Sequence, residues 1–236
     1  MKKFQVAQMA IVVLVLICTG LAHGAIVSPY WQRIGAGFPN QVTVYGLAKE
    51  YHYPYAEIQL QIPQLLGVAD PKWQAQFNAE LATKIADFVQ EVVAQGEEVY
   101  TESDTALAMP YSGVVGYEVK TNRGGLLSLA ITYYSFTGGA HGMTFVDYIN
   151  IDLTTGCSID FADMFPTEEE LTRAASAING EIAKEPEWFF IDQFTVDLFT
   201  PDQGFYFQED QVIVCFGLYE LAPYAAGIQE FAVSAP

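Results

Sequence analysis

Three strand-like segments follow one another in the middle of the chain, with only short glycine-rich connections between them. We expect these strands at 114–120, 126–136 and 144–153. Asn122-Arg123-Gly124-Gly125 supplies the first turn, and Gly138-Gly139-Ala140-His141-Gly142 joins the second strand to the third. Because consecutive strands with short connections lie side by side, this part of the chain predicts an antiparallel meander.

Two amphipathic helices are predicted, one before and one after the meander. Asp70-Pro71 combines an N-cap residue with proline at the first helical position, and apolar residues then recur at three- and four-residue intervals as far as Gly96. The second helix begins at Thr167, where Thr167-Glu168-Glu169-Glu170 fits a capping box, and it ends at Lys184-Glu185-Pro186. Each helix has one apolar stripe that must be buried.

Further strands are indicated before and after the helices. The segment 56–62 alternates apolar and polar residues with period two, which favours a strand with one buried face. The segments 41–45, 205–207 and 212–216 also read as strands. We therefore expect an α+β fold in which a curved, mainly antiparallel sheet of about seven strands has two helices packed on one face.

The N-terminus has the pattern of a secretory signal. Lys2 and Lys3 precede an uncharged run, and small residues then lead to an expected cleavage between Gly24 and Ala25. Two alternatives to cleavage remain, which are a lipid anchor on Cys18 and an uncleaved signal segment. We expect contact with the membrane only if the signal segment is retained. We expect an exported protein that is periplasmic, at the cell surface or secreted.

The chain is strongly acidic, with 10 Lys and Arg against 28 Asp and Glu. Removal of residues 1–24 takes away two lysines, which leaves 8 basic against 28 acidic residues and a net charge of −20. This sign excludes nucleic acid as a natural partner, because phosphate binding needs basic residues. The charge favours either solubility outside the cell or the attraction of a cationic partner.

Cys157 and Cys215 would be the two cysteines of the processed chain. An even pair in an exported protein makes a disulfide between them possible. The alternative is two small apolar residues, since Cys215 lies within a predicted strand and sequence does not place the two Cα atoms within bridging distance.

Residue patterns for catalysis are scarce. No G-x-S-x-G motif or phosphate-binding loop occurs, and the two histidines of the processed chain, His52 and His141, do not have the spacing of helical metal ligands. We expect neither a metal nor a cofactor. Asp160 and Asp163 form the best local carboxylate pair, which leaves a glycosidase-type reaction open. His141 would either fix its hairpin by hydrogen bonds or line a binding groove.

Four motifs in a fixed order resemble the bacterial extracytoplasmic domain of unknown function 3298. They are Tyr133 to Gly142, Asn150 to Gly156, Phe161-Ala162-Asp163-Met164-Phe165 and Tyr219 to Gly227. The upstream part, with Tyr53-Pro54-Tyr55 and the helix that follows, is similar to the companion domain of unknown function 4163. The resemblance implies an α+β fold in which both halves share one structural unit. We expect residues 1–24 as a signal, 25–40 as a lead-in, 41–110 as the N-terminal half and 111–236 as the C-terminal half.

The resemblance also implies a function in the cell envelope. Relatives include an anti-sigma factor whose outer domain binds lysozyme and a peptidoglycan deacetylase that carries this unit ahead of its catalytic domain. Neither a long segment before the apolar run nor a further domain after the last motif is present, so we expect the recognition unit alone. The expected partner is a cationic protein such as lysozyme or a cell-wall glycan such as peptidoglycan. The alternatives are a carbohydrate-active hydrolase and a purely structural envelope protein.

The candidate ligand-binding residues come from two of the four motifs. The first motif contributes Tyr134, Gly138, Gly139, Ala140, His141 and Gly142, and the last contributes Tyr219, Glu220, Pro223 and Tyr224.

Overall fold

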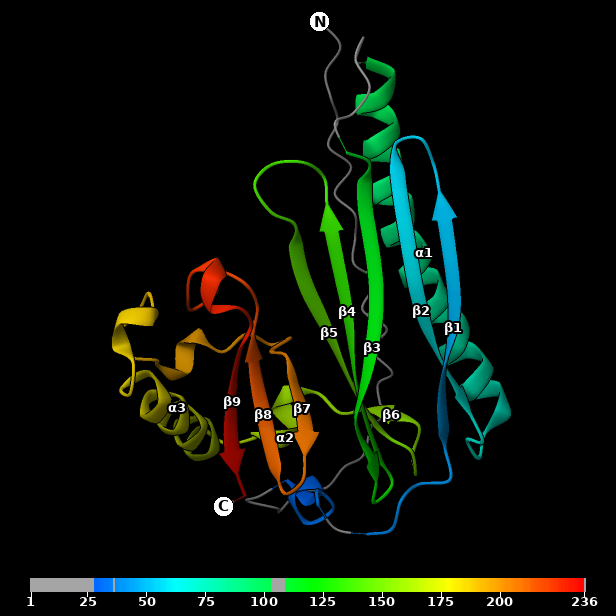
Figure 1. The fold of residues 1–236 in the computed structure, drawn as a ribbon. Coiled ribbons are helices and arrows are strands. Elements are labelled where there is room, and N and C mark those ends of the chain that lie inside the picture. The colour runs from blue at the N-terminus through cyan, green and yellow to red at the C-terminus, as the bar shows by residue number, and fades with distance from the viewer. Residues whose placement is uncertain (1–27, 36, 103–108, 236) are drawn as a thin grey trace, which may run out of the picture.

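The computed structural model describes residues 28–35, 37–102 and 109–235, so the predicted signal and its cleavage site lie outside the described residues. Figure 1 shows two sheets with helices packed against them. The larger sheet contains β1 (Thr43–His52), β2 (Ala56–Leu66), β3 (Tyr111–Arg123), β4 (Leu126–Phe136), β5 (Met143–Asp152) and β6 (Cys157–Ser158). The smaller sheet contains β7 (Phe205–Gln208), β8 (Gln211–Phe216) and β9 (Gln229–Ser234). The helices are α1 (Pro71–Glu102), α2 (Phe161–Met164) and α3 (Glu168–Ile182), with short 3-10 turns at Pro29–Gln32, Pro186–Trp188, Val196–Leu198 and Tyr224–Ala226.

The α+β class and the antiparallel meander β3–β4–β5 are confirmed, but the described strands form two sheets rather than one. The larger sheet has the order β1-β2-β3-β4-β5-β6, and its strands pair antiparallel except for β2 and β3, which are parallel. The helix α1 is the crossover between those two strands. Because β2 and β3 come from opposite sides of residue 110, one sheet contains strands from both expected halves.

The helix α1 starts as the sequence indicates and ends later. Asp70 Oδ1 accepts hydrogen bonds from the backbone N–H groups of Lys72 and Trp73 at 2.9 and 3.2 Å. The helix continues through Gly96 to Glu102, so that glycine does not end it. A Cβ atom at Gly96 would lie 2.7 Å from the carbonyl oxygen of Tyr55. Among the described residues, no helix has the length and apolar composition to cross a membrane.

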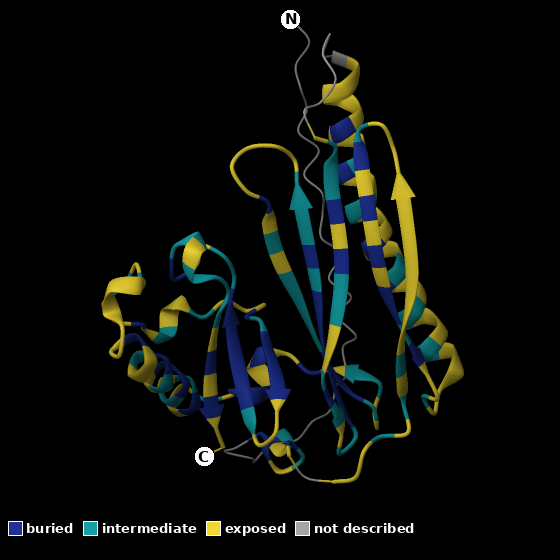
Figure 2. Ribbon diagram, viewed as in Figure 1, coloured by how far each residue is buried: buried dark blue, intermediate teal, exposed yellow. Residues whose placement is uncertain are grey.

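The helix α1 covers one face of the larger sheet, where alternate strand residues meet its apolar stripe. The buried side chains of this core include Ile58, Leu60, Ile85, Leu129 and Ile131. The strand β1 lies at the sheet edge and is exposed along almost its whole length, as Figure 2 shows.

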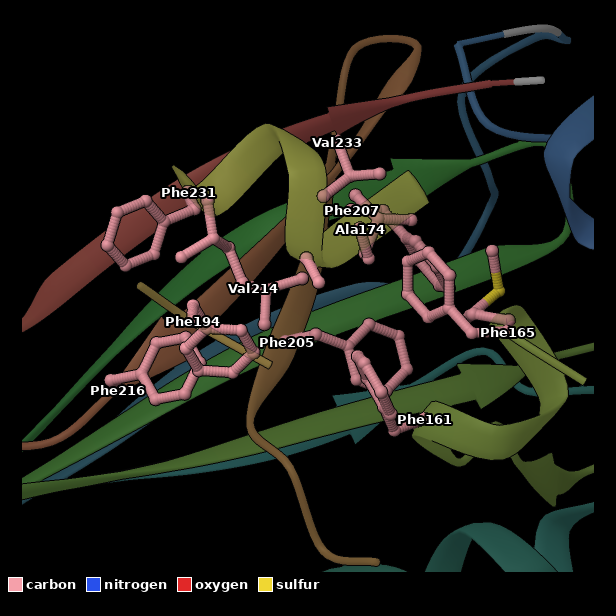
Figure 3. Close-up of a cluster of buried hydrophobic side chains, with 14 of the residues drawn as sticks. Phe161, Phe165, Ala174, Phe194, Phe205, Phe207, Val214, Phe216, Phe231 and Val233 are labelled. Carbon is pink, nitrogen blue, oxygen red and sulfur yellow. The ribbon is translucent and has the colours of Figure 1, made fainter. Parts of the chain in front are cut away.

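The smaller sheet packs with α2 and α3 around a second core, which is rich in phenylalanine. Figure 3 shows Phe194, Phe205, Phe207 and Phe216 packed together, with Ala174 of α3 close by. The predicted cap of α3 is confirmed, since Thr167 Oγ1 accepts a hydrogen bond from the backbone N–H of Glu170 at 3.2 Å. The two predicted helices therefore cover different sheets rather than one common face.

The strand β4 is buried on both faces between Leu126 and Ile131, because it lies between these two cores. Its odd-numbered residues, such as Leu129 and Ile131, face α1. Its even-numbered residues face the smaller sheet, and Leu126 belongs to the phenylalanine-rich core. Near-continuous apolar sequence in this strand follows from burial on both sides.

Three polar side chains attach the edge of β7 to the larger sheet, and we call Thr121, Ser128 and Asn150 the polar row. Ser128 pairs with Thr121 across β3–β4 and with Asn150 across β4–β5, so the three side chains stand side by side on one face. All three are buried. Ser128 Oγ donates to Asn150 Oδ1 at 2.5 Å, which fixes the orientation of the amide.

The polar row satisfies backbone groups of β7 that point away from β8. Asn150 Nδ2 donates to the carbonyl oxygen of Phe205 at 2.8 Å, and Thr121 Oγ1 donates to that of Phe207 at 2.7 Å. The N–H of Phe207 donates to Ser128 Oγ at 3.3 Å. Since an unpaired buried backbone group costs about 1–3 kcal/mol, these contacts determine where the smaller sheet can dock.

Arg33 attaches the N-terminal segment to the end of β5. Its guanidinium group forms a two-pronged ion pair with Asp152, with distances of 2.7 Å from Nη1 and 2.9 Å from Nη2. It also donates to the carbonyl oxygens of Gly124 and Gly125 at 3.1 Å. Burial of Asp152 opposes its ionisation, but the hydrogen bonds from Arg33 and Thr154 prevail and lower the pKa of its carboxyl group to about 2.

Of the two possibilities for Cys157 and Cys215, the disulfide between them is excluded, because Cys215 is a free and buried thiol. Cys157 lies on β6 at the edge of the larger sheet, whereas Cys215 lies on the central strand of the smaller sheet. Cys215 packs in a small cluster with Tyr206, Ile213 and Tyr148. Its burial raises the pKa of the thiol to about 12, so the alternative of a small apolar core residue describes it correctly.

Replacement of Asn150 by Ala should destabilise the fold by about 1–3 kcal/mol, because the buried carbonyl of Phe205 loses its donor. The measurement is the free energy of unfolding in urea. The control is Gln76→Ala on the exposed face of α1, which should change stability by less than about 0.5 kcal/mol. Equal stabilities for the two variants would contradict this role of the polar row.

The Asp152→Asn variant should lose stability in a pH-dependent manner. The folded-state pKa of about 2 lies below the ordinary value of 3.8, so ionised Asp152 contributes stability above pH 4 that disappears as pH falls through 2. We expect a difference in unfolding free energy of about 2 kcal/mol at neutral pH, closing near pH 2. Urea unfolding at a series of pH values tests this. The exposed Asp202→Asn change is the matched control, and a pH-independent difference at Asp152 would contradict the assignment.

Candidate functional site

The two predicted motifs meet in space, although they belong to different sheets. Residues 137–142 connect β4 to β5 in the larger sheet, and residues 217–228 connect β8 to β9 in the smaller one. His141, Tyr219 and Tyr224 are in mutual contact where the connections meet, and we call these three residues the aromatic cluster.

His141 is the centre of the aromatic cluster. Its ring stacks on Tyr224 with a centroid distance of 3.8 Å and an interplanar angle of 22°. Its Nε2 lies 3.3 Å from the hydroxyl oxygen of Tyr219, and its Nδ1 lies 2.9 Å from the carbonyl oxygen of Gly142. His141 is exposed, so the ring joins the two connections and also remains accessible to a partner. The two alternatives for this residue, a hairpin-fixing role and a place in a binding surface, are thus compatible.

Glycines shape the connection that carries His141. Gly138 and Gly139 have φ angles of +94° and +91°, which side-chain-bearing residues rarely adopt. A Cβ atom at Gly142 would lie 2.4 Å from ring carbons of Tyr134, so that ring packs directly over the glycine backbone. The Tyr224 hydroxyl donates to the carbonyl oxygen of Gly142 at 3.0 Å. These contacts place Tyr134 and Gly142 beneath the aromatic cluster.

The other predicted residues surround the aromatic cluster, of which Tyr219 is the member that bonds to His141 through its hydroxyl group. Gly138, Gly139 and Ala140 are exposed at the tip of the β4–β5 connection. Tyr219 has a φ angle of +67° and is 48% exposed, so its ring projects into solvent. Glu220 is exposed and its backbone N–H donates to the carbonyl oxygen of Gly217 at 3.2 Å. Pro223 comes directly before the 3-10 turn that positions Tyr224.

The carboxylate pair at Asp160 and Asp163 has a local structural role. Asp163 Oδ2 accepts the backbone N–H of Asp160 at 2.8 Å and so closes the first turn of α2. Burial, followed by the charge of Asp163, raises the pKa of Asp160. Within the described residues, no carboxylate forms a hydrogen bond or ion pair with His141, and no group of three or more His, Cys, Asp or Glu residues could hold a metal ion. The arrangement can recognise a surface through aromatic rings and hydrogen bonds.

A second surface feature was missed from the sequence. A shallow depression of about 200 Å³ lies across β1, β2 and β3, and its lining includes Ala48, Glu50, Gln59, Gln61 and Gly116. The alternation of apolar and polar residues in β2 was a signal for this depression, because Gln59 and Gln61 had to face away from the core. The sequence did not indicate which other strands would lie beside them.

Comparison with protein-family models assigns both parts of the chain. Residues 50–144 match the model described as deacetylase PdaC, and residues 162–235 match protein of unknown function DUF3298. The chain carries a PdaC domain followed by a DUF3298 domain. The predicted resemblance to family 3298 is thereby confirmed, whereas the one to family 4163 stays a prediction. In the aromatic cluster, His141 comes from the PdaC match, and Tyr219 and Tyr224 come from the DUF3298 match.

Solved structures of DUF3298 proteins share this fold. One from Bacteroides fragilis has a TM-score of 0.60 at 15% identity, with coverage of 84% of this chain and 91% of that chain. One from Pseudomonas aeruginosa has a TM-score of 0.57 at 20% identity, with coverage of 83% and 92%. No curated protein gave a significant match. The PdaC and DUF3298 segments therefore form an arrangement that recurs at low sequence identity.

His141→Ala and Tyr224→Ala should show an energetic coupling of about 1 kcal/mol in a double-mutant cycle, because either change removes the same ring stack. The measurement is the unfolding free energy of the native protein, both single variants and the double variant. Pairing His141→Ala with Phe38→Ala, which removes an exposed ring that does not contact His141, should give additive changes. Additivity for His141 and Tyr224 as well would show that the stack adds no stability.

Proposed function

We propose that this chain is an exported, non-catalytic recognition domain that binds a cationic, cell-wall-active protein of the lysozyme type. The observation that carries the proposal is the exposed aromatic cluster, to which both the PdaC and the DUF3298 segments contribute. Tyrosine rings provide large contact areas at little cost in side-chain entropy, and they are enriched among the residues that dominate binding energy. The contacts of His141 to tyrosines and backbone fit recognition better than acid–base catalysis.

The charge of the protein supports a cationic partner. Residues 25–236 carry a net charge of −20, and such a field attracts basic proteins over about 10 Å at ordinary ionic strength. The resemblance to an anti-sigma factor that binds lysozyme points to the same class of partner. A cell-wall glycan is the other ligand that the resemblance implies, and it forms the second arm of the test.

Isothermal calorimetry of residues 25–236 with lysozyme and with peptidoglycan fragments tests the proposal. We expect micromolar or tighter binding of lysozyme that weakens as salt is raised, because the attraction is partly electrostatic. Tyr219→Ala and Tyr224→Ala should each weaken binding about tenfold or more, whereas the exposed Phe38→Ala should leave it unchanged. Binding of peptidoglycan alone would overturn the choice of partner, and no binding of either would leave the structural envelope role.

Export is part of the proposal and has its own test. When the full chain is produced in a bacterium, the processed protein should begin at Ala25 and be recovered outside the cytoplasm. N-terminal sequencing and fractionation measure this. Replacement of Ala22 and Gly24 by bulky residues should block processing, while Gly20→Ala should not. A mature protein that still begins at Met1 would contradict cleavage.

A further inference from the structure

The depression across β1, β2 and β3 lies on the face of the larger sheet opposite α1. Glu50 pairs with Gln59 and Gln59 pairs with Val114, while Ala48 pairs with Gln61, so these side chains share one face. The adjacent residues Ile58, Leu60 and Val115 point the other way into the core beneath α1. The pairing of β2 with β3 ends at Leu60 and Val115, and the depression opens where those two strands separate.

Part of the lining of the depression is apolar and open. It includes Ala48, Val114 and Gly116, and Val114 is 37% exposed. A Cβ atom at Gly116 would meet nothing within 4 Å, so the fold itself does not require a glycine there. Glycine inside a strand is unfavourable by roughly 0.5–1 kcal/mol, and it often marks a place where another group approaches closely.

The lining of the depression also contains hydrogen-bond acceptors. Glu50 contributes a carboxylate, whose described partner is the exposed His52 at 4.0 Å. Gln59 and Gln61 contribute side-chain amide groups that are exposed on the same face. Lys49 also borders the depression, but it pairs with the buried Leu60, so its side chain leaves from the opposite face of β1.

We propose that this depression binds the side chain of an arginine from a cationic protein partner. Its volume of about 200 Å³ is smaller than the roughly 300–1,000 Å³ of sites for drug-sized ligands and suits a single long side chain. The aliphatic stem would lie on Val114 and Gly116, and the guanidinium group would donate to Glu50 and to the carbonyl oxygens of Gln59 and Gln61. The identity of the partner rests on the proposed function, and the −20 charge of residues 25–236 favours this occupant over an anionic or neutral one.

The depression and the aromatic cluster lie on the same face of the larger sheet. Val114 pairs with Tyr134 across β3–β4, and the Tyr134 ring packs over Gly142 beside His141. Neighbouring strands are about 5 Å apart, so one partner surface of ordinary size reaches both features. The arginine would thus be a second anchor for a protein that contacts the tyrosines.

The direct test uses a small probe and no protein partner. N-acetyl-arginine amide is titrated into isotope-labelled residues 25–236, and NMR chemical shifts are followed. We expect saturable shifts at the backbone amides of Gln61, Val115 and Gly116, and binding about tenfold weaker for the neutral isostere N-acetyl-citrulline amide. Absence of these shifts, equal binding of the two probes, or shifts caused only by N-acetylglucosamine would overturn the proposal.

Two variants test separately how the shape of the depression and the charge of Glu50 contribute to arginine binding. Gly116→Leu fills the depression and should abolish the shifts without unfolding the protein, because its side chain enters open space. Glu50→Gln keeps the shape and should weaken arginine binding severalfold. The control is Gly180→Ala on α3, another glycine with nothing within 4 Å, which should leave the titration unchanged. Unchanged arginine binding in Gly116→Leu would place the probe elsewhere and overturn the proposal.

The same variants distinguish this inference from the proposed function. If wild-type protein binds lysozyme and Gly116→Leu binds it equally well, the arginine anchor fails and the proposed function stands. If the arginine probe binds but no cationic protein does, the depression is confirmed and the proposed partner fails.

Discussion

The docking of β7 on the larger sheet is the constraint on which the rest of the structure depends. A strand with an unpaired edge can enter a dry interface only if its backbone groups find partners. The polar row supplies them from three adjacent strands, with Asn150 and Thr121 as donors and Ser128 as acceptor. The position of β7 fixes β8 and β9 by pairing, and the β8–β9 connection then lies against the β4–β5 connection. The polar row therefore helps to place the two connections that form the aromatic cluster.

The two faces of the larger sheet serve different purposes. One face is buried under α1. The other face is covered at one end by the smaller sheet and remains open at the other end, where Glu50, Gln59, Val114 and Tyr134 form a continuous cross-strand row. This open part of the sheet face lies next to the aromatic cluster, because Val114 pairs with Tyr134 and the Tyr134 ring packs over Gly142.

Patterns within a single element predicted much of the fold. The caps at Asp70 and Thr167 and the alternation in β2 appear in the structure because local hydrogen bonds and burial of one face determine them. The meander followed from short turns. The residues of the aromatic cluster were singled out only through a family resemblance, and no sequence pattern predicted that His141 would contact Tyr219.

The sequence-based predictions fail where contacts between segments distant in the sequence determine the structure. Two sheets were not foreseen, because the docking of β7 depends on side chains far from it in sequence. Gly96 was interpreted as a helix end, although its role is to let α1 approach Tyr55. The pair Cys157 and Cys215 satisfied a rule about even numbers, but that rule contains no information on distance.

The polar row also has a consequence for dissecting the protein. The two family matches end at 144 and begin at 162, and Asn150 lies between them on β5. A fragment that stops at 144 would lack most of β5, the strand that pairs with one edge of β4. A fragment that starts at 162 would expose to water the edge of β7 that the polar row covers. We therefore expect that neither matched segment folds alone. Each supplies part of the interface that allows the other to be buried.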